Sequence, residues 1–182
     1  MRAASTFWIT GLPRSRTAWF SQAMRGPYST CFHELTADCR SFEDFRQAWF
    51  SSDALYSGNA DSACGLQITR ILDEIRPRTL IVERPIGEVL ASLADIGIAW
   101  EGLRSRLEQL EETLSLSDPL IKRVRFEDLN DRDAVIEAAE WLVPGHGVDA
   151  ASLLGLNIQV TPKRIAALAD LRHTLWHLER AA

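Results

Sequence analysis

The stretch FWITGLPRSRTAWFSQAM, residues 7–24, decides the fold that this sequence predicts. Its first part is an apolar run that breaks at Gly11, a combination typical of a buried strand that ends in a tight turn. Residues 15–25 favour a helix, which Gly26-Pro27 would stop. A strand, a turn and a helix start in this order direct several backbone N–H groups to one place. The turn is therefore predicted to bind an anion.

The rest of the chain repeats this alternation. Strands are predicted at residues 6–11, 29–33, 55–60, 79–85 and 120–126. Helices are predicted at 15–25, at 41–50, from Asp61 or Ser62 to Arg76, and at 87–94, 100–114, 131–142 and 161–178. This order predicts an α/β fold, a three-layer α/β/α arrangement around a mostly parallel five-stranded sheet.

In such sheets ligands bind at the carboxyl ends of the strands. The turn after the first strand, the Glu83-Arg84 edge and the loop after Phe126 should therefore share one rim.

Composition limits the range of functions. The chain has 182 residues, 46% of them hydrophobic, which indicates a single domain over residues 1–182 with a helical C-terminal cap from about residue 131. A net charge of -5 argues against general nucleic-acid binding. Of the 20 Lys and Arg residues 18 are Arg, which suits local binding of an oxyanion but is equally explained by a GC-rich genome.

Three cysteines at these spacings indicate neither a disulfide framework nor a metal site, so no metal is expected. No apolar stretch is long enough to cross a bilayer, and the start is too short for a signal peptide. We expect a cytoplasmic protein without a membrane partner.

The turn differs from the nucleotide-phosphate loop of the Walker type, G-x-x-x-x-G-K-[ST]. Counted from Gly11, Arg16 stands at the second glycine, Thr17 at the lysine and Ala18 at the hydroxyl that binds magnesium. The sequence therefore predicts a site for an anion without magnesium.

The segment GLPRSRTAW resembles the 5'-phosphosulfate loop of the sulfotransferase superfamily, commonly G-x-P-[KR]-S-G-T-[TS]-[WL]. Arg16 and Ala18 depart from that pattern, and the residues that agree with it are Gly11, Pro13, Arg14, Ser15, Thr17 and Trp19. VERPIGEVLASL is similar to the family's R-[DN]-P-x-x-x-x-x-S, with matches at Arg84, Pro85 and Ser92. VRFEDL, residues 124–129, is similar to its V-x-Y-E-D-L. The three motifs stand in the family's order across roughly two thirds of the chain.

The resemblance implies a P-loop nucleoside-triphosphate-hydrolase-like fold and an enzyme that uses 3'-phosphoadenosine 5'-phosphosulfate. It places the 5'-phosphosulfate at Pro13, Arg14, Ser15, Arg16, Thr17 and Ala18. Arg14 would also stabilise the charge that gathers on the bridging oxygen. Arg84 and Ser92 would recognise the 3'-phosphate.

The base that accepts the acceptor's proton is sought at the end of the second strand. Some prokaryotic members of the family carry a catalytic Glu in this region, so Glu34 is the first candidate and His33 the second. Neighbours in a strand point to opposite faces, so only one of the two is expected to face the site.

Other interpretations remain open. Arg14 and Arg16 could be exposed turn cations, and Arg84 could belong to a structural ion pair. Asp61 could orient an acceptor, although helix capping is favoured. Arg16 at the crest of the turn could add an oxyanion contact or block one. The leucines of residues 103–114 predict either core packing or the seam of a homodimer.

The late R-K-G-x-x-G-D-W-K loop of eukaryotic sulfotransferases has no counterpart after Leu129. Two alternatives to a sulfotransferase are a P-loop kinase-like phosphotransferase and a non-catalytic nucleotide-binding or scaffold protein. The acceptor, a hydroxyl or an amine of a small molecule, a glycan or a peptide, is not specified by the sequence.

Overall fold

A computed structural model describes residues 5–155 of the chain. Its strands are β1 (Ser5–Gly11), β2 (Ser29–His33), β3 (Tyr56–Ala60), β4 (Arg78–Glu83) and β5 (Ile121–Arg125). Its α-helices are α1 (Thr17–Ala23), α2 (Phe42–Phe50), α3 (Ile68–Glu74), α4 (Ile86–Ala94), α5 (Leu103–Leu114), α6 (Arg132–Leu142) and α7 (Ala150–Leu154). Short 3₁₀ turns lie at η1 (Leu35–Asp38), η2 (Ala63–Gln67) and η3 (Asp128–Asn130).

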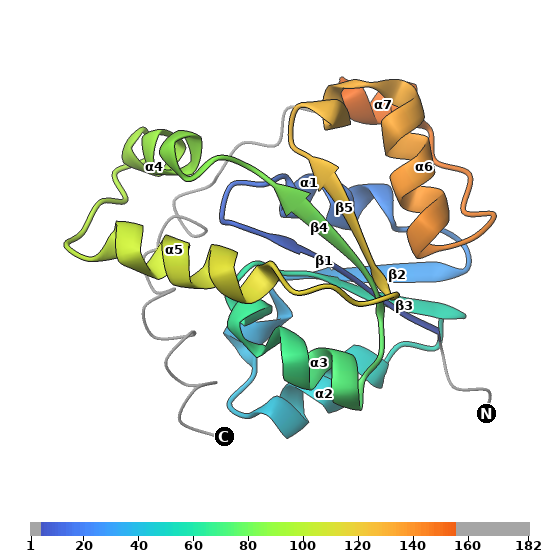
Figure 1. The fold of residues 1–182 in the computed structure, drawn as a ribbon. Coiled ribbons are helices and arrows are strands. Elements are labelled where there is room, and N and C mark those ends of the chain that lie inside the picture. The colour runs from blue at the N-terminus through green and yellow to red at the C-terminus, as the bar shows by residue number, and fades with distance from the viewer. Residues whose placement is uncertain (1–4, 156–182) are drawn as a thin grey trace.

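The five strands form one parallel sheet in the order β2-β3-β1-β4-β5, with β1 in the centre (Figure 1). Ile9 of β1 stands level with Ala60 of β3 on one side and with Leu80 of β4 on the other. The chain builds one half of the sheet first and then crosses β1 to build the other half. The carboxyl end of β1 is therefore the point where the strand order reverses, the usual ligand position in such sheets.

Alternate residues of the strands face two separate hydrophobic cores. Phe7 and Ile9 pack with residues of α1, α6 and α7, whereas Trp8 packs with residues of α2, α3, α4 and α5. Helices thus cover both faces of the sheet (Figure 1), and the predicted three-layer α/β/α fold is confirmed. The sheet is entirely parallel, where a mostly parallel sheet was predicted.

The leucine stripe of α5 belongs to the core. Leu107, Leu110 and Leu114 are buried in the cluster that covers the Trp8 side of the sheet. Apolar side chains at this helical spacing stabilise the fold by roughly 1.5–3 kcal/mol each when they are fully buried. The core interpretation of this stripe is therefore confirmed.

Helix boundaries differ from the prediction where the backbone takes left-handed dihedrals. The first helix begins at Thr17 instead of residue 15, because Arg14 and Arg16 have φ values of 68° and 61°.

The helix predicted from Asp61 or Ser62 to Arg76 is η2 followed by α3. Helices α6 and α7 begin the predicted C-terminal helical cap, and the helix predicted at 161–178 lies outside the described residues.

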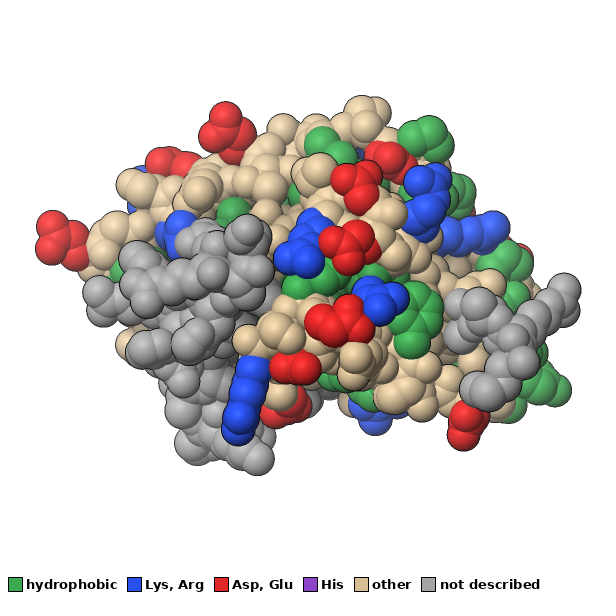
Figure 2. Space-filling view, turned by 90° about the horizontal axis from the view of Figure 1, so that it is seen from below, with side chains coloured by type: hydrophobic (Ala, Val, Ile, Leu, Met, Phe, Trp, Pro, Cys, Tyr) green, Lys and Arg blue, Asp and Glu red, His purple; other side chains and the backbone are tan. Residues whose placement is uncertain are grey.

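Charges of both signs are mixed on the face seen in Figure 2, which views the molecule from below. Some surface charges form ion pairs within one helix, such as Arg46–Glu43 at 2.9 Å on α2 and Arg70–Glu74 at 2.7 Å on α3. Within residues 5–155 no helix has both the length and the apolar character needed to span a bilayer.

Candidate functional site

The site is built around the β1–α1 turn, residues 11–16. Gly11 has φ 154°, and a Cβ at this position would lie 2.4 Å from the carbonyl oxygen of Val82 in β4. Only glycine allows strands β1 and β4 to approach this closely at residue 11. Arg14 and Arg16 follow with left-handed dihedrals on either side of Ser15. This conformation bends the chain sharply at the carboxyl end of the central strand.

The bend leaves hydrogen-bond donors without acceptors. The amides of Arg14, Ser15 and Arg16 donate to no backbone carbonyl among residues 5–155. Ser15 is fully buried, and its hydroxyl has no hydrogen-bond partner among the same residues. Buried donors are normally paired, and turns that gather successive N–H groups form concave sites for anions. Pro13 and Thr17 are buried beside them, while Ala18 is half-buried.

The two predicted halves of the nucleotide site touch one another. Arg84, at the end of β4, donates from Nη1 to the carbonyl oxygen of Arg14 at 2.7 Å. Arg14 in turn donates from Nε to Oγ of Ser92 in α4 at 3.1 Å. The prediction that the turn and the Glu83-Arg84 edge share one rim is confirmed.

Three guanidinium groups gather at this rim. The pKa values of Arg14 and Arg16 are both lowered, mainly by burial and secondly by the positive charge of Arg84. Asp95 partly offsets this effect on the pKa of Arg14. Glu88 lies 3.4 Å from Nε of Arg84 and is itself half exposed. The cluster is thus a region of like charge that an anion would stabilise.

Arg16 lies against the β5–α6 connection, residues 126–131. Its Nη1 donates to the carbonyl oxygen of Leu129 at 2.6 Å and its Nη2 to Oδ1 of Asn130. Its guanidinium carbon lies 4.8 Å from the centre of the Phe126 ring. The loop after Phe126 therefore joins the same rim, as predicted.

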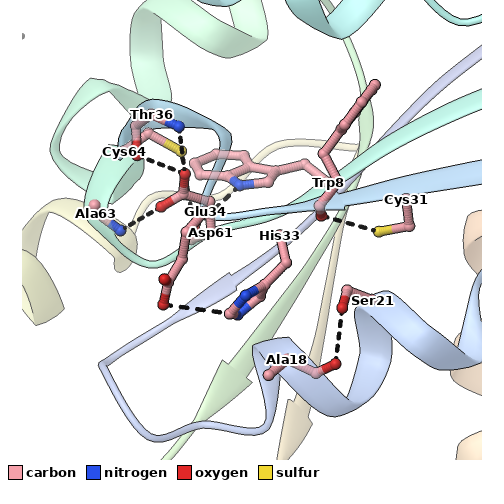
Figure 3. Close-up of polar contacts among 11 residues, drawn as sticks. Trp8, Ala18, Ser21, Cys31, His33, Glu34, Thr36, Asp61, Ala63 and Cys64 are labelled. Atoms are coloured by element: carbon pink, nitrogen blue, oxygen red, sulfur yellow. Dashed lines mark hydrogen bonds and ion pairs between the residues drawn. The ribbon is translucent and has the colours of Figure 1, made fainter. Parts of the chain in front are cut away.

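His33 and Glu34 lie together, contrary to the expectation that they face opposite ways. His33 Nε2 is 3.7 Å from Glu34 Oε1, and Figure 3 shows the two side chains pointing toward one another. The alternation of a strand does not reach Glu34, because β2 ends at His33 and Glu34 has a left-handed φ of 55°. Two strand spacings, roughly 10 Å, separate the ends of β2 and β1, with β3 between them.

Asp61 joins two of the loops at the carboxyl ends of the strands. Its Oδ2 accepts hydrogen bonds from the amide and hydroxyl of Thr36 at 3.0 and 2.6 Å, and its Oδ1 accepts one from the amide of Ala63 at 2.7 Å (Figure 3). Burial raises the pKa of this carboxyl, although these hydrogen bonds oppose the rise. The capping interpretation is supported, since Asp61 is fully buried and holds the start of η2.

Sequence reasoning did not assign the partners of the arginines. Phe126 lies in a quoted motif but received no role, although both Arg84 and Arg16 lie over its ring. Glu88 follows Arg84 by four residues, a spacing at which opposite charges on a helix meet. The sequence could therefore have predicted the Arg84–Glu88 ion pair. The contact between Arg16 and Asn130 spans 114 residues and leaves no local signal.

Within residues 5–155 no group of three or more His, Cys, Asp or Glu side chains is placed to hold a metal ion.

A scan of the chain against protein-family models and a search of curated proteins found no match.

Proposed function

We propose that this protein is a sulfotransferase that binds 3'-phosphoadenosine 5'-phosphosulfate and transfers the sulfuryl group to a hydroxyl or amine acceptor. The observation that carries the proposal is the chain of contacts from Arg84 to Arg14 and from Arg14 to Ser92. These contacts join residues that lie far apart in the sequence and that are assigned to the two anionic groups of the donor.

The donor set fits such a ligand. Sulfate and phosphate oxygens accept hydrogen bonds, and this rim offers amides, the buried hydroxyl of Ser15 and the guanidinium groups of Arg14 and Arg84. Guanidinium groups bind such oxygens in paired geometry, and a fixed set of donors stabilises charge that develops on a leaving oxygen. The Arg14 guanidinium is the group we assign to that charge, while Arg84 and Ser92 hold the 3'-phosphate.

The transfer itself needs one base. The bond from sulfur to the phosphate oxygen breaks, a bond from sulfur to the acceptor forms, and 3'-phosphoadenosine 5'-phosphate leaves. The acceptor's proton passes to Glu34, which His33 holds in place from 3.7 Å. Because Glu34 lies beyond the end of β2, its carboxylate is at the same edge of the sheet as the turn.

A magnesium nucleotide is a poorer fit to the turn. Thr17 and Ala18 stand where a Walker loop carries lysine and the hydroxyl ligand of magnesium. A kinase-like reaction would have to manage without both groups.

Thermal-shift titration tests the proposal, because a ligand that binds only the folded state raises the melting temperature. We expect 3'-phosphoadenosine 5'-phosphate to stabilise the protein more than adenosine 5'-phosphosulfate, which lacks the 3'-phosphate. ATP with magnesium should stabilise it least. Equal or greater stabilisation by ATP with magnesium would overturn the proposal in favour of a phosphotransferase. Binding of the 3'-phosphorylated nucleotide without turnover of any acceptor would indicate a binding protein.

A further inference from the structure

Arg16 occupies a backbone conformation that suits glycine. Its φ and ψ are 61° and 20°, in the left-handed region that L side chains rarely adopt. A side chain is retained at such a position only when its contacts compensate for the strain.

Both hydrogen bonds of the Arg16 side chain and its nearer ring contact go to the β5–α6 connection, while the Trp19 ring of α1 lies farther away, at 5.9 Å. The guanidinium binds the carbonyl oxygen of Leu129 at 2.6 Å and the amide oxygen of Asn130, and it lies 4.8 Å from the ring centre of Phe126. Leu129 is fully buried in the core, so its carbonyl is a fixed partner. Asp131 closes the segment by capping α6, since its side chain accepts from the amides of Asp133 and Ala134.

The same connection also contacts the anion-binding arginine on the other side. The guanidinium carbon of Arg84 lies 4.1 Å from the ring centre of Phe126. Phe126 therefore touches a cation from the β1–α1 turn and a cation from the end of β4. A movement of Phe126 would displace the Arg84 guanidinium and, with it, the hydrogen bond to Arg14.

We infer that Arg16 is a positioning residue, which fastens the β5–α6 connection to the β1–α1 turn and thereby holds Phe126 and Arg84 in place for the anion. The Arg16 guanidinium acts through these residues and not on the ligand, whereas its backbone amide stays among the donors of the turn. The inference rests on the proposed function for its effect on affinity. The fastening itself is a property of the protein alone.

Three single variants and one double variant test it. Arg16→Gly removes the side chain and relieves the left-handed strain, so the variant should fold. Arg16→Lys keeps the charge but cannot form the two-pronged contact. Asn130→Ala removes one partner and leaves Arg16 in the turn. Hydrogen exchange of the amides at 127–131 is measured without ligand, with the amides of α2 as the internal control. Affinity for 3'-phosphoadenosine 5'-phosphate is measured by calorimetry.

We expect exchange at 127–131 to rise about tenfold in Arg16→Gly, with no change in α2, and affinity to fall by about the same factor. Arg16→Lys should resemble Arg16→Gly. The double variant Arg16→Gly/Asn130→Ala should be no weaker than Arg16→Gly, because both changes remove one shared contact.

Unchanged exchange at 127–131 in Arg16→Gly would overturn the inference, whatever the affinities. Full affinity in Arg16→Lys would overturn the inference, because it would show that the charge of Arg16 acts on the anion. A loss of affinity in Arg16→Gly with no loss in Asn130→Ala would also overturn it, because it would indicate a direct contact between Arg16 and the anion. Failure of the unaltered protein to bind the nucleotide would overturn the proposed function and the effect on affinity. The exchange result would then still decide whether Arg16 fastens the connection.

Discussion

The Arg84 guanidinium donates a hydrogen bond to the backbone carbonyl of Arg14 at 2.7 Å, across 70 residues of sequence. This bond fixes the peptide that follows Arg14, where the chain takes its first left-handed turn. Arg84 is therefore both a cation at the rim and a brace for the amides of the β1–α1 turn. Its removal should affect anion binding through both roles.

Arg84→Ala should weaken binding of 3'-phosphoadenosine 5'-phosphate by about tenfold to a hundredfold, the range expected for losing hydrogen bonds from a charged group. Calorimetric titration of the variant measures the change.

Arg70 offers a matched control for Arg84. Arg84 pairs with Glu88 four residues later and lies 4.1 Å from the Phe126 ring, while Arg70 pairs with Glu74 four residues later and lies 4.0 Å from the Phe42 ring. Arg70 belongs to α3, and its ion pair and ring contact join it to Glu74 and Phe42 instead of to the β1–α1 turn. Arg70→Ala should leave the affinity unchanged, and an equal loss in both variants would point to a general effect of charge.

Gly11→Ala should destabilise the protein on the order of 3 kcal/mol, through a clash with the Val82 carbonyl and a strained φ. Gly87→Ala is the control, because nothing lies within 4 Å of an added Cβ in α4. That change should stabilise the fold by ~0.5–1 kcal/mol. Urea unfolding of both variants measures the difference, and a tolerated Gly11→Ala would show that β1 and β4 can move apart at this point.

The order of strands and helices was predictable because each depends on local pattern. The apolar run before Gly11 lies in β1, and residues 79–83 of the strand predicted at 79–85 lie in β4, which ends before Pro85 caps α4. The shared rim followed from topology alone, since parallel strands end at one edge.

The details of the site were not predictable because they depend on left-handed residues other than glycine. Arg14, Arg16 and Glu34 all adopt positive φ, and only at Arg16, where both compared loop patterns carry glycine, does the sequence give a signal of it. At Glu34 this reversed the expected relation to His33, and at Arg16 it turned a presumed crest residue toward Asn130. Such conformations are stabilised by contacts distant in sequence, so one sequence does not reveal them.

The three cysteines should be unreactive in the folded protein. Burial raises the pKa of the Cys39 thiol to about 11 and raises the pKa of Cys31 and Cys64 as well. The thiolate is the reactive form, so alkylation of Cys39 by iodoacetamide at pH 8 should be roughly two orders of magnitude slower than in the unfolded chain. Mass spectrometry of the labelled protein measures this. Rapid labelling of Cys39 would indicate that the segment η1 opens in solution.

Glu34→Gln should lower turnover by roughly a hundredfold to ten-thousandfold, the usual contribution of a general base, and leave donor binding intact. Release of 3'-phosphoadenosine 5'-phosphate in the presence of a phenol, an aliphatic alcohol or an amine provides the assay. His33→Ala should have a smaller effect, because His33 acts on the position of Glu34. Unchanged turnover in Glu34→Gln would remove Glu34 from the proposed mechanism.

Asp61→Asn should change how stability depends on pH. The folded-state pKa of Asp61 is raised above the unfolded value of about 3.9, so above that pH the folded protein binds more protons than the unfolded chain. Asp61 therefore favours folding most at low pH, and its contribution falls as pH rises through the window up to its raised pKa.

The asparagine variant does not titrate at this position, and it supplies only one acceptor oxygen for the donors on Thr36 and Ala63. It should be less stable than the unaltered protein by ~1–3 kcal/mol at pH 4. That gap should narrow as pH rises, by up to about 1.4 kcal/mol per pH unit inside the window. Urea unfolding at a series of pH values from 4 to 8 measures it. A gap that stays constant would mean that the hydrogen bonds from Thr36 and Ala63 fully offset the burial of the carboxylate.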